Sequence, residues 1–335
     1  MSTEGNGFNG ATKSTAARGC FIYEGDRAVN EYLQFHFGRP EEVLPYKCGP
    51  MEALGFTKRC AELCIKAMGS SKASTAEFTN GVTTNGVGLN GGTTDVGISN
   101  GGRHVGLVTP QKQPLRAMDV GCSVGGVTFE LTTYFDEVVG VDYSARFVET
   151  AESMRVEGRN GDPLHSAPYQ CLEQGSVALR RNAVLPGGSV PSRARFVRGD
   201  ACALDTEALG LFDAVVASNI LCRLQKPRKF LGDLHKFVKP GGVAVIISPY
   251  SWQAEYTDPS EWLGGRREGG NGIGNGYGNG AFIDSFDEIC SIMEADCNFK
   301  LEERLPMPFL IREHAREFQW GCSDGLVWRR QQASS

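Results

Sequence analysis

The pattern of apolar and polar positions along the chain changes near residue 115. From there to about residue 250, short aliphatic runs such as 115–120 alternate with stretches such as 124–134, in which apolar residues recur at helical spacing. Strands that alternate with helices in this way are typical of parallel βαβ units. The pattern therefore predicts an α/β protein with a doubly wound, mostly parallel sheet, which binds its ligand at the carboxyl ends of the first strands.

The same alternation gives the individual elements that we expect. Strands are expected at 115–120, 137–141, 195–197, 212–218 and 242–248, followed by late strands at 299–305 and 326–330. Helices are expected at 124–134, 145–157, 225–238 and 285–294. Segment 158–191 is polar and contains glycine and proline, so we expect a longer connection there.

The N-terminal part has a helical pattern of its own. Residues 23–37 carry apolar side chains at helical spacing, and Pro40 and Pro45 follow them and end the helix. A second helix is expected at about 51–68. We therefore predict a helical lid or appendage over residues 20–68.

Glycine is unusually frequent, with 43 residues in a chain of 335. It is concentrated at 80–106 and 264–280, where its neighbours are mainly small or polar residues. Such segments bury too little apolar area to offset the entropy lost on ordering. We therefore expect a disordered tail at 1–19, a low-complexity insert at 69–113, and a main domain at 114–331 that contains a Gly/Asn-rich loop at about 266–280.

The charge of the chain limits its partners and location. The net charge is −5, which argues against a nucleic-acid partner recognised through a general positive field. No apolar run approaches the length of a membrane helix, and the N-terminus lacks an apolar signal core. We expect no membrane association and a cytoplasmic location, with organelle targeting by the tail as the open alternative.

The 11 cysteines are odd in number and follow no disulfide or zinc-ligand spacing. The five histidines are dispersed along the chain as well. We therefore expect buried free thiols in a reducing compartment and no bound metal.

The most informative motif follows the first predicted strand of the α/β region. The strand ends at Asp119, and Gly121, Gly125 and Gly126 come before the next helix. Glycine lets the backbone turn sharply and approach a ligand closely. A dinucleotide-binding loop would have a glycine where Ser123 stands, and an acid at the start of the loop repels phosphate. The loop therefore suits a ligand that carries an ammonium group.

Two further acids follow the next strands in the expected sheet order. Asp142 ends the second strand and suits a ribose diol, while Asp200 follows the third strand and suits an exocyclic amine of adenine. The fourth strand leads into Asn219, and a Lys-Pro-Gly-Gly turn comes before the fifth. Capping of helices and turns is the alternative role for these acids.

This ordered set resembles the class I S-adenosylmethionine-dependent methyltransferases over about residues 115–250. The resemblance implies a Rossmann-like, seven-stranded sheet, S-adenosylmethionine as cofactor and S-adenosylhomocysteine as product. By this resemblance Asp119, Gly121 and Gly125 surround the amino-acid moiety. The rest of the implied cofactor site comprises Asp142 at the ribose, Asp200 and Ala201 at the adenine, Asn219 near the sulfonium, and the neighbouring Cys122, Ser123 and Tyr143.

Motifs outside this region resemble a narrower family. They are YEGDR at 23–27 with Tyr32 and His36, SPYSW at 248–252 with EWLGG at 261–265, and REHAREFQWG at 312–321. Together they resemble the C-terminal methyltransferase domain of ovothiol-biosynthesis sulfoxide synthases, over about 20–68 and 114–331. The resemblance implies methylation of a ring nitrogen of thiol-histidine, the final step to ovothiol. Because the dispersed histidines form no iron-binding cluster, we expect a standalone methyltransferase with a functional link to a separate synthase.

The acceptor pocket is expected to combine aromatic walls with one cation. A mercaptoimidazole ring could stack on aromatic residues, and an arginine could bind its carboxylate bidentately. Arg27 is the first choice for that arginine, and His36 or His314 could orient a ring proton. No single catalytic residue is assigned, and the candidates for the acceptor pocket are Tyr23, Arg27, His36, Tyr250, Trp252, Trp262, Arg312 and His314.

Structural roles remain open for five of these acceptor candidates: Arg27, His36, Trp252, Trp262 and His314. Two other functions also remain open: a methyltransferase of another small amine, imidazole or carboxylate, and a non-catalytic cofactor-binding module.

Overall fold

The computed structural model describes residues 18–76, 113–156, 165–266 and 282–332. The predicted tail at 1–19, insert at 69–113 and loop at 266–280 therefore lie largely outside the described residues. The described start of the insert, up to Ala76, is helical.

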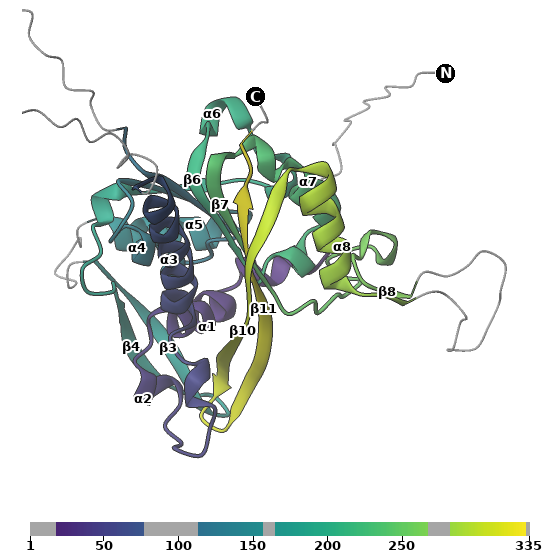
Figure 1. The fold of residues 1–335 in the computed structure, drawn as a ribbon. Coiled ribbons are helices and arrows are strands. Elements are labelled where there is room, and N and C mark those ends of the chain that lie inside the picture. The colour runs from purple at the N-terminus through teal and green to yellow at the C-terminus, as the bar shows by residue number, and fades with distance from the viewer. Residues whose placement is uncertain (1–17, 77–112, 157–164, 267–281, 333–335) are drawn as a thin grey trace, which may run out of the picture.

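A seven-stranded sheet forms the centre of the fold, in the order β10-β11-β7-β6-β1-β2-β5 (Figure 1). Five neighbouring strands run parallel, whereas β11 pairs antiparallel with both β7 and β10. The strands are β1 (Arg116–Val120), β2 (Glu137–Asp142), β5 (Ala194–Arg198), β6 (Phe212–Ser218), β7 (Val238–Ser248), β10 (Phe299–His314) and β11 (Glu317–Arg330). The predicted doubly wound, mostly parallel sheet is confirmed, and the fold is Rossmann-like.

Helices cover both faces of the sheet because its central strands are apolar on both sides. On one face, α3 (Phe56–Ala76) and α4 (Gly126–Leu131) pack on Ala117, Val216 and Val245. The other face carries α7 (Pro227–Asp233) and α8 (Ser285–Ser291). The remaining elements are α5 (Ala145–Arg155), α6 (Thr206–Leu209), β8 (Gly265–Arg266), β9 (Phe282–Ile283) and the short 3-10 or π-helical turns η3 (Pro191–Arg193), η4 (Ala201–Ala203), η5 (Leu221–Arg223), η6 (Leu234–Lys236), η7 (Pro259–Glu261) and η8 (Ile292–Asp296).

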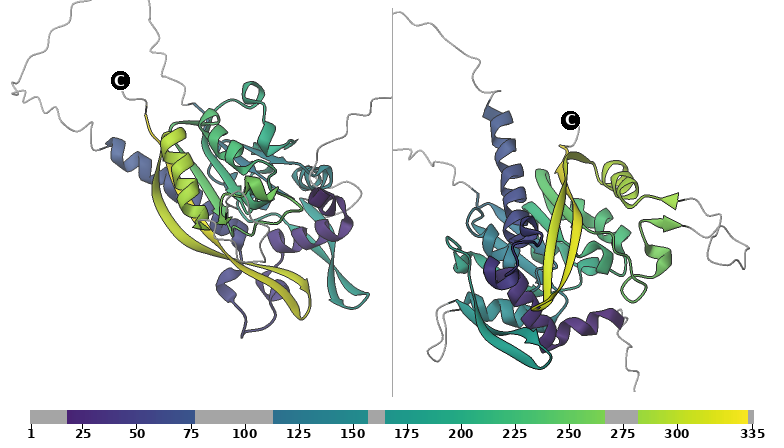
Figure 2. Two further views of the ribbon diagram at one scale, coloured as in Figure 1. Left: turned by 90° about the vertical axis from the view of Figure 1, so that its right-hand side faces the viewer. Right: turned by 90° about the horizontal axis from the view of Figure 1, so that it is seen from below.

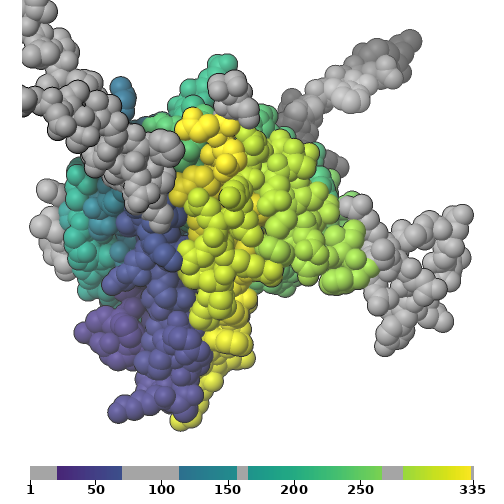
Figure 3. Space-filling model, in the orientation of Figure 1, coloured from purple at the N-terminus to yellow at the C-terminus, as the bar shows by residue number. Residues whose placement is uncertain are grey.

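The N-terminal segment comprises η1 (Arg18–Glu24), α1 (Asp26–Phe37), α2 (Pro40–Val43) and η2 (Met51–Ala53), followed by α3. It is integrated into the fold, because Cys60 and Cys64 of α3 are fully buried in the same core as the sheet. In Figure 3 its surface lies directly beside that of β10 and β11. Helix α3 also continues to Ala76, eight residues beyond the expected end at Met68.

Two β-hairpins differ from the sequence prediction. Segment 158–191 was predicted as a connection, but β3 (Ser166–Gln174) and β4 (Val177–Val184) form an antiparallel hairpin there. Its buried positions alternate along β3 and pack against α1. The late strands are also much longer than predicted and join as a second hairpin. Both hairpins flank α1 (Figure 2), and the cavity described below depends on that arrangement.

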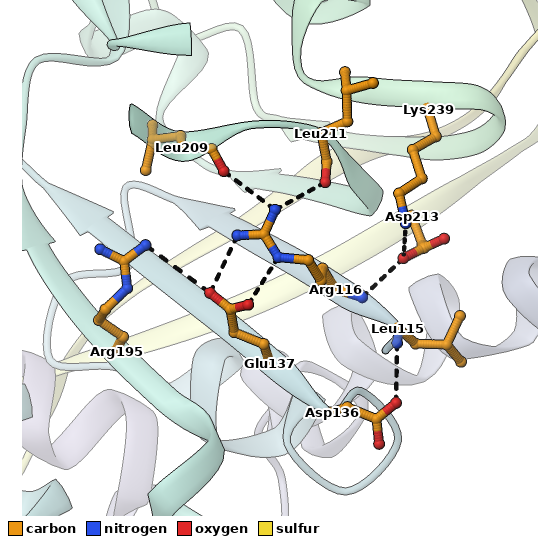
Figure 4. Close-up of polar contacts among 9 residues, drawn as sticks. All are labelled: Leu115, Arg116, Asp136, Glu137, Arg195, Leu209, Leu211, Asp213 and Lys239. Atoms are coloured by element: carbon orange, nitrogen blue, oxygen red, sulfur yellow. Dashed lines mark hydrogen bonds and ion pairs between the residues drawn. The ribbon is translucent and has the colours of Figure 1, made fainter. Parts of the chain in front are cut away.

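The amino-terminal edge of the sheet is fixed by charged side chains (Figure 4). The Arg116 guanidinium donates to both carboxylate oxygens of Glu137, at 2.8 and 3.1 Å, and to the carbonyl oxygens of Leu209 and Leu211. Asp213 accepts hydrogen bonds from the backbone N–H of Arg116 and from Lys239 Nζ. These contacts join β1 to its neighbours β2 and β6 and to β7 beyond them. They lie where the parallel strands begin, whereas the cavity described below lies at the carboxyl ends of these strands.

Every cysteine whose side chain is described is a free thiol, and most are buried as predicted. Cys48 and Cys322 are exposed, so the prediction of burial is wrong for these two. Among the described helices, none is long and apolar enough to cross a membrane. The described residues also contain no group of three or more His, Cys, Asp or Glu side chains arranged to hold a metal ion.

Candidate active site

A cavity of about 560 Å³ opens at the carboxyl ends of the parallel strands. Its floor is formed by the ends of β1, β2 and β6 and by the loop that follows β5. Helix α1, the loop after β7 and the β10–β11 hairpin form the other walls. The loops at the strand ends and these three other segments of the chain therefore line the same cavity.

Asp119, at the end of β1, is completely buried at the base of the cavity. Its Oδ2 accepts a hydrogen bond from Thr128 Oγ1 at 2.7 Å, whereas Oδ1 has no partner among the described residues. Burial raises the pKa of this carboxyl to about 7. A buried carboxylate with an unused oxygen is suited to a cationic ligand group.

Asp142, at the end of β2, is held by backbone donors. Its Oδ2 accepts from the Ser123 N–H at 2.8 Å and its Oδ1 from the Ser144 N–H at 2.9 Å. Burial nevertheless raises its pKa to about 6. Both oxygens retain lone pairs, so they can accept further hydrogen bonds from a ribose diol.

The glycines of the first loop have different tasks. Gly121 lines the cavity at φ +76°, and a Cβ there would lie 2.5 Å from Ile220 Cδ1. Gly125, at φ +90°, immediately precedes α4 and packs against Phe196, outside the cavity lining. Only the first glycine therefore allows a ligand to approach the backbone, while the second allows close packing of helix and strand.

The remaining predicted cofactor residues also line the cavity: Cys122, Ser123, Tyr143, Asp200, Ala201 and Asn219. Asp200 uses one carboxylate oxygen to accept from the Cys202 N–H at 2.8 Å, so its predicted capping role is present beside the cavity. Asn219 adopts φ +55°, and its Oδ1 accepts from Ser323 Oγ at 2.6 Å. Burial raises the pKa of the Cys122 thiol, which therefore stays neutral.

Of the predicted acceptor residues, Tyr23 and His36 line the cavity. His36 Nδ1 accepts a hydrogen bond from the Gly126 N–H at 3.0 Å, and burial lowers the pKa of the ring to about 3. A neutral ring that accepts at Nδ1 carries its proton on Nε2. His36 can therefore donate a hydrogen bond from Nε2, but it cannot serve there as a base.

Three charged candidates do not line the cavity, because other side chains or backbone groups bind them. Arg27 is largely exposed, and its Nε pairs with Glu31 Oε1 at 2.8 Å. Arg312, on β10, is buried, with Nη2 2.7 Å from Glu173 Oε1 of β3. His314 pairs with Glu317 near the hairpin turn.

The three aromatic candidates from the loop after β7 also lie outside the cavity lining. Tyr250 donates to Asp324 Oδ2 at 3.0 Å, and Trp252 Nε1 donates to Ser285 Oγ at 3.1 Å. Trp262 Nε1 donates to the Thr257 carbonyl at 2.9 Å. These contacts organise the loop behind the wall of the cavity.

Other residues take the places expected for these side chains, and the sequence analysis missed them as site residues. The aromatic ones are Tyr32, Phe35, Phe56, Tyr256, Phe309 and Trp320, and the charged ones are Glu31, Arg223 and Glu313. Four of them had a signal in the sequence: Tyr32, Glu313 and Trp320 belong to the motifs quoted above, and Arg223 follows Asn219 by four residues. The other side chains follow no strand end, and only the folding of distant segments brings them together.

Residues 118–246 match the sequence profile of a family described as a methyltransferase domain. The chain carries a class I S-adenosylmethionine-dependent methyltransferase domain. The match covers the strands β1, β2, β5 and β6 and nearly all of β7, which supply the floor of the cavity. S-adenosylmethionine is the cofactor of this methyltransferase.

Solved structures similar to the methyltransferase include a SAM-dependent methyltransferase from Methanosarcina mazei, with 16% identity, 66% of this chain and 94% of that chain covered, and a TM-score of 0.39. Another is the N-methyltransferase NodS from Bradyrhizobium japonicum WM9 in complex with S-adenosylhomocysteine, with 15% identity, coverage of 65% and 79%, and a TM-score of 0.37. Among curated protein sequences, none matches this chain.

Proposed function

We propose that this methyltransferase transfers the methyl group of S-adenosylmethionine to a ring nitrogen of thiol-histidine. The observation that carries the proposal is the division of one cavity into two halves. The half at the strand ends bears the acids Asp119, Asp142 and Asp200, whereas the other half is aromatic and contains Arg223 with Glu31 and Glu313. An aromatic pocket with both signs of charge suits a small zwitterion that has a planar ring. The motif resemblance to the ovothiol methyltransferase domains supplies the identity of that zwitterion.

The strand-end half fits the cofactor on physical grounds. The unused Oδ1 of buried Asp119 and its raised pKa indicate a site that lacks a positive charge. An ammonium group would supply that charge, Asp142 would accept from the ribose hydroxyls, and Asp200 would accept from the adenine amine. The bound cofactor supplies an electrophilic methyl group on a sulfonium.

The residues around the acceptor orient its ring and exclude water. His36 holds its proton on Nε2, facing away from Gly126, and can donate to a ring atom or a thiolate. Burial raises the pKa of Tyr32 to about 12, so this phenol also stays protonated and donates. A mercaptoimidazole nitrogen is nucleophilic without a strong base, so positioning is the main contribution that these residues make.

The test is an assay of the purified methyltransferase with S-adenosylmethionine and a panel of acceptors. The panel contains thiol-histidine, histidine, histamine and other small amines, imidazoles and carboxylates, and the position of the methyl group is determined by NMR. We expect turnover of thiol-histidine with one methyl group added to a ring nitrogen. Turnover of histidine but not of its thiol form would overturn the proposal. Turnover of another panel member alone would favour the broader small-molecule function.

A further inference from the structure

Arg223 is a cation on the cavity wall without an anionic partner. It ends η5 (Leu221–Arg223) directly after β6, and it is only partly accessible to solvent. No Asp or Glu among the residues that the structure describes forms an ion pair with it, and none is a major influence on its pKa. Charged groups removed from water normally meet an opposite charge.

Three other arginines with limited exposure show what Arg223 lacks. Arg116 meets Glu137, Arg312 meets Glu173 and Arg329 meets Glu302, each at 2.7 to 2.8 Å. None of these three lines the cavity. Arg59, which is also half-buried, has no carboxylate partner either, but it donates to two backbone carbonyls and lies outside the cavity lining. Arg223 thus combines an unpaired guanidinium with a place on the wall of the ligand cavity.

The guanidinium of Arg223 is held in place by neutral groups. Nη1 donates to the Ser251 carbonyl at 2.8 Å and to the Cys222 carbonyl at 3.2 Å. The guanidinium carbon lies 4.7 Å from the ring centroid of Tyr256. Nη1 also donates to Cys222 Sγ at 3.3 Å, and Tyr23 is a further hydrogen-bond partner of the guanidinium. These contacts fix the orientation of the guanidinium but give it no anionic partner among the described residues.

Two phenols complete the surroundings of this arginine. The rings of Tyr23 and Tyr256 lie 6.2 Å apart, and both residues line the cavity. Burial is the largest cause that raises the pKa of each phenol above its ordinary value, so both stay protonated. The two hydroxyls hydrogen-bond to each other, and Tyr23 also hydrogen-bonds to Arg223. An arginine beside two linked, neutral phenols is a suitable receptor for a carboxylate.

A singly charged anion fits this position better than a phosphate. Glu31, Asp142 and Glu313 line the same cavity, and Asp142 and Arg223 both act electrostatically on Tyr32. The surrounding acids would repel a dianion more strongly than a carboxylate.

We propose that Arg223, Tyr23 and Tyr256 form a subsite that binds the α-carboxylate of the acceptor and selects amino acids over their decarboxylated amines. The subsite deepens the proposed function, because it assigns the end of the acceptor opposite to its reacting ring. It also replaces the two arginines expected from the sequence, Arg27 and Arg312, whose guanidinium groups already have carboxylate partners.

The test uses Arg223→Gln with thiol-histidine and its decarboxylated analogue as acceptors. We expect KM for thiol-histidine to rise about 10- to 100-fold, as for the loss of hydrogen bonds to a charged group. KM for the decarboxylated analogue and the Kd of S-adenosylhomocysteine should change little. Arg223→Lys should recover part of the affinity, and Arg228→Gln is the matched control because neither Arg228 nor its ion-pair partner Glu288 lines the cavity.

Two results would overturn the subsite. If Arg223→Gln weakens S-adenosylhomocysteine and leaves KM unchanged, the carboxylate bound here is that of the cofactor. If KM rises equally for both acceptors, Arg223 does not recognise a carboxylate at all. Melting temperatures of the variants show whether each is folded.

The wild-type enzyme separates these results from failure of the proposed function. If it does not methylate thiol-histidine, the same comparison is made with the panel acceptor that it does methylate and the decarboxylated form of that acceptor. Equal KM changes for that pair would again reject the subsite.

Discussion

The two halves of the cavity are built in different ways. The cofactor half consists of residues that directly follow β1, β2, β5 and β6, so the backbone of neighbouring strands sets its geometry. The acceptor half combines η1, α1, the start of α3, η5, the loop after β7 and the β10–β11 hairpin. A change in the first half should therefore act on the cofactor alone, whereas the second half depends on how distant segments pack.

The charges of the two halves differ in the same way. The cofactor half presents Asp119 and Asp142, whose pKa values are raised by burial, and the described residues give neither of them an ion-pair partner. The acceptor half presents Arg223 without an anion. The cofactor half thus has no cation paired with its two acids among the described residues, and the acceptor half has no anion paired with Arg223, although Glu31 and Glu313 line the same half.

The largest expected effect is that of Gly121→Ala in the cofactor half. The new Cβ would lie 2.5 Å from Ile220 Cδ1 at a residue with φ +76°, so both contact and backbone conformation oppose it. We expect the Kd of S-adenosylhomocysteine to rise by at least about 100-fold, measured by calorimetry.

Gly175→Ala is the matched control for this variant. Gly175 has φ +56° in the turn between β3 and β4, and its Cβ would meet nothing within 4 Å. It should lose about 1 kcal/mol of stability and no affinity. Equal affinities for the two variants would contradict the role of close approach at Gly121.

The next effect in size is that of Asp142→Asn. The amide keeps one acceptor oxygen but loses the charge and the second acceptor, so we expect about 1–3 kcal/mol weaker binding of S-adenosylhomocysteine. This corresponds to a Kd about 5- to 150-fold higher. Asp258→Asn, which alters the N-cap carboxylate of η7 outside the cavity lining, is the control. An unchanged Kd for Asp142→Asn would remove this residue from the cofactor half.

Much of the fold could be predicted because the central strands are buried on both faces. Runs such as 212–218 have no polar alternation and stand out from the helices around them. The β3–β4 hairpin was missed because only β3 alternates clearly, while most of β4 is exposed. The expected strand ends at 305, whereas β10 continues to His314 through Pro306 and Pro308. Proline in a strand pattern normally argues against a central strand, but β10 lies at the edge of the sheet, where a missing N–H is tolerated.

In the candidate site, too, residues placed by a single strand could be predicted, whereas residues placed by contacts between distant segments could not. Asp119 and Asp142 were found because the end of a parallel strand fixes where a side chain lies. The acceptor residues are predicted from their chemical type alone, and the type of a side chain does not reveal which neighbour it binds in the folded protein. Arg312 and Trp252 have suitable chemistry, but Glu173 and Ser285 already bind them. Only the packed structure distinguishes these side chains from Arg223.

A smaller effect is expected from the pH dependence of cofactor binding. Asp119 has a pKa of about 7 in the ligand-free protein, and a cationic group binds its ionised form. The ionised fraction rises about tenfold between pH 6 and pH 8, so the Kd of S-adenosylhomocysteine should fall by up to about tenfold over this range. Asp119→Asn should flatten the profile, and a profile that stays unchanged in this variant would exclude Asp119 as the cause.

The sign of this effect can be checked independently through stability. Because its folded-state pKa lies above that of an unfolded aspartate, Asp119 holds its proton longer in the folded state. The contribution of Asp119 to the stability of the ligand-free protein therefore falls as pH rises from about 4 to 7. His36, whose pKa is lowered to about 3, acts in the opposite direction up to about pH 6.5, so the Asp119 effect is measured as the difference between the wild type and Asp119→Asn. The increase in melting temperature caused by S-adenosylhomocysteine should consequently grow between pH 6 and pH 8.

The smallest effects on KM and stability are expected from substitutions of two tryptophans, one in the cavity lining and one in the loop that supports it. Trp320 lines the cavity and is 56% exposed, whereas Trp252 lies behind the wall and donates to Ser285 Oγ. Trp320→Leu should raise KM for the acceptor a few-fold, about 1 kcal/mol, with little change in melting temperature. Trp252→Phe should cost about 1 kcal/mol of stability through the lost hydrogen bond and leave KM unchanged. If Trp252→Phe raised KM at an unchanged melting temperature, the acceptor half would extend to the residues of SPYSW, and the boundary drawn here between cavity wall and supporting loop would be wrong.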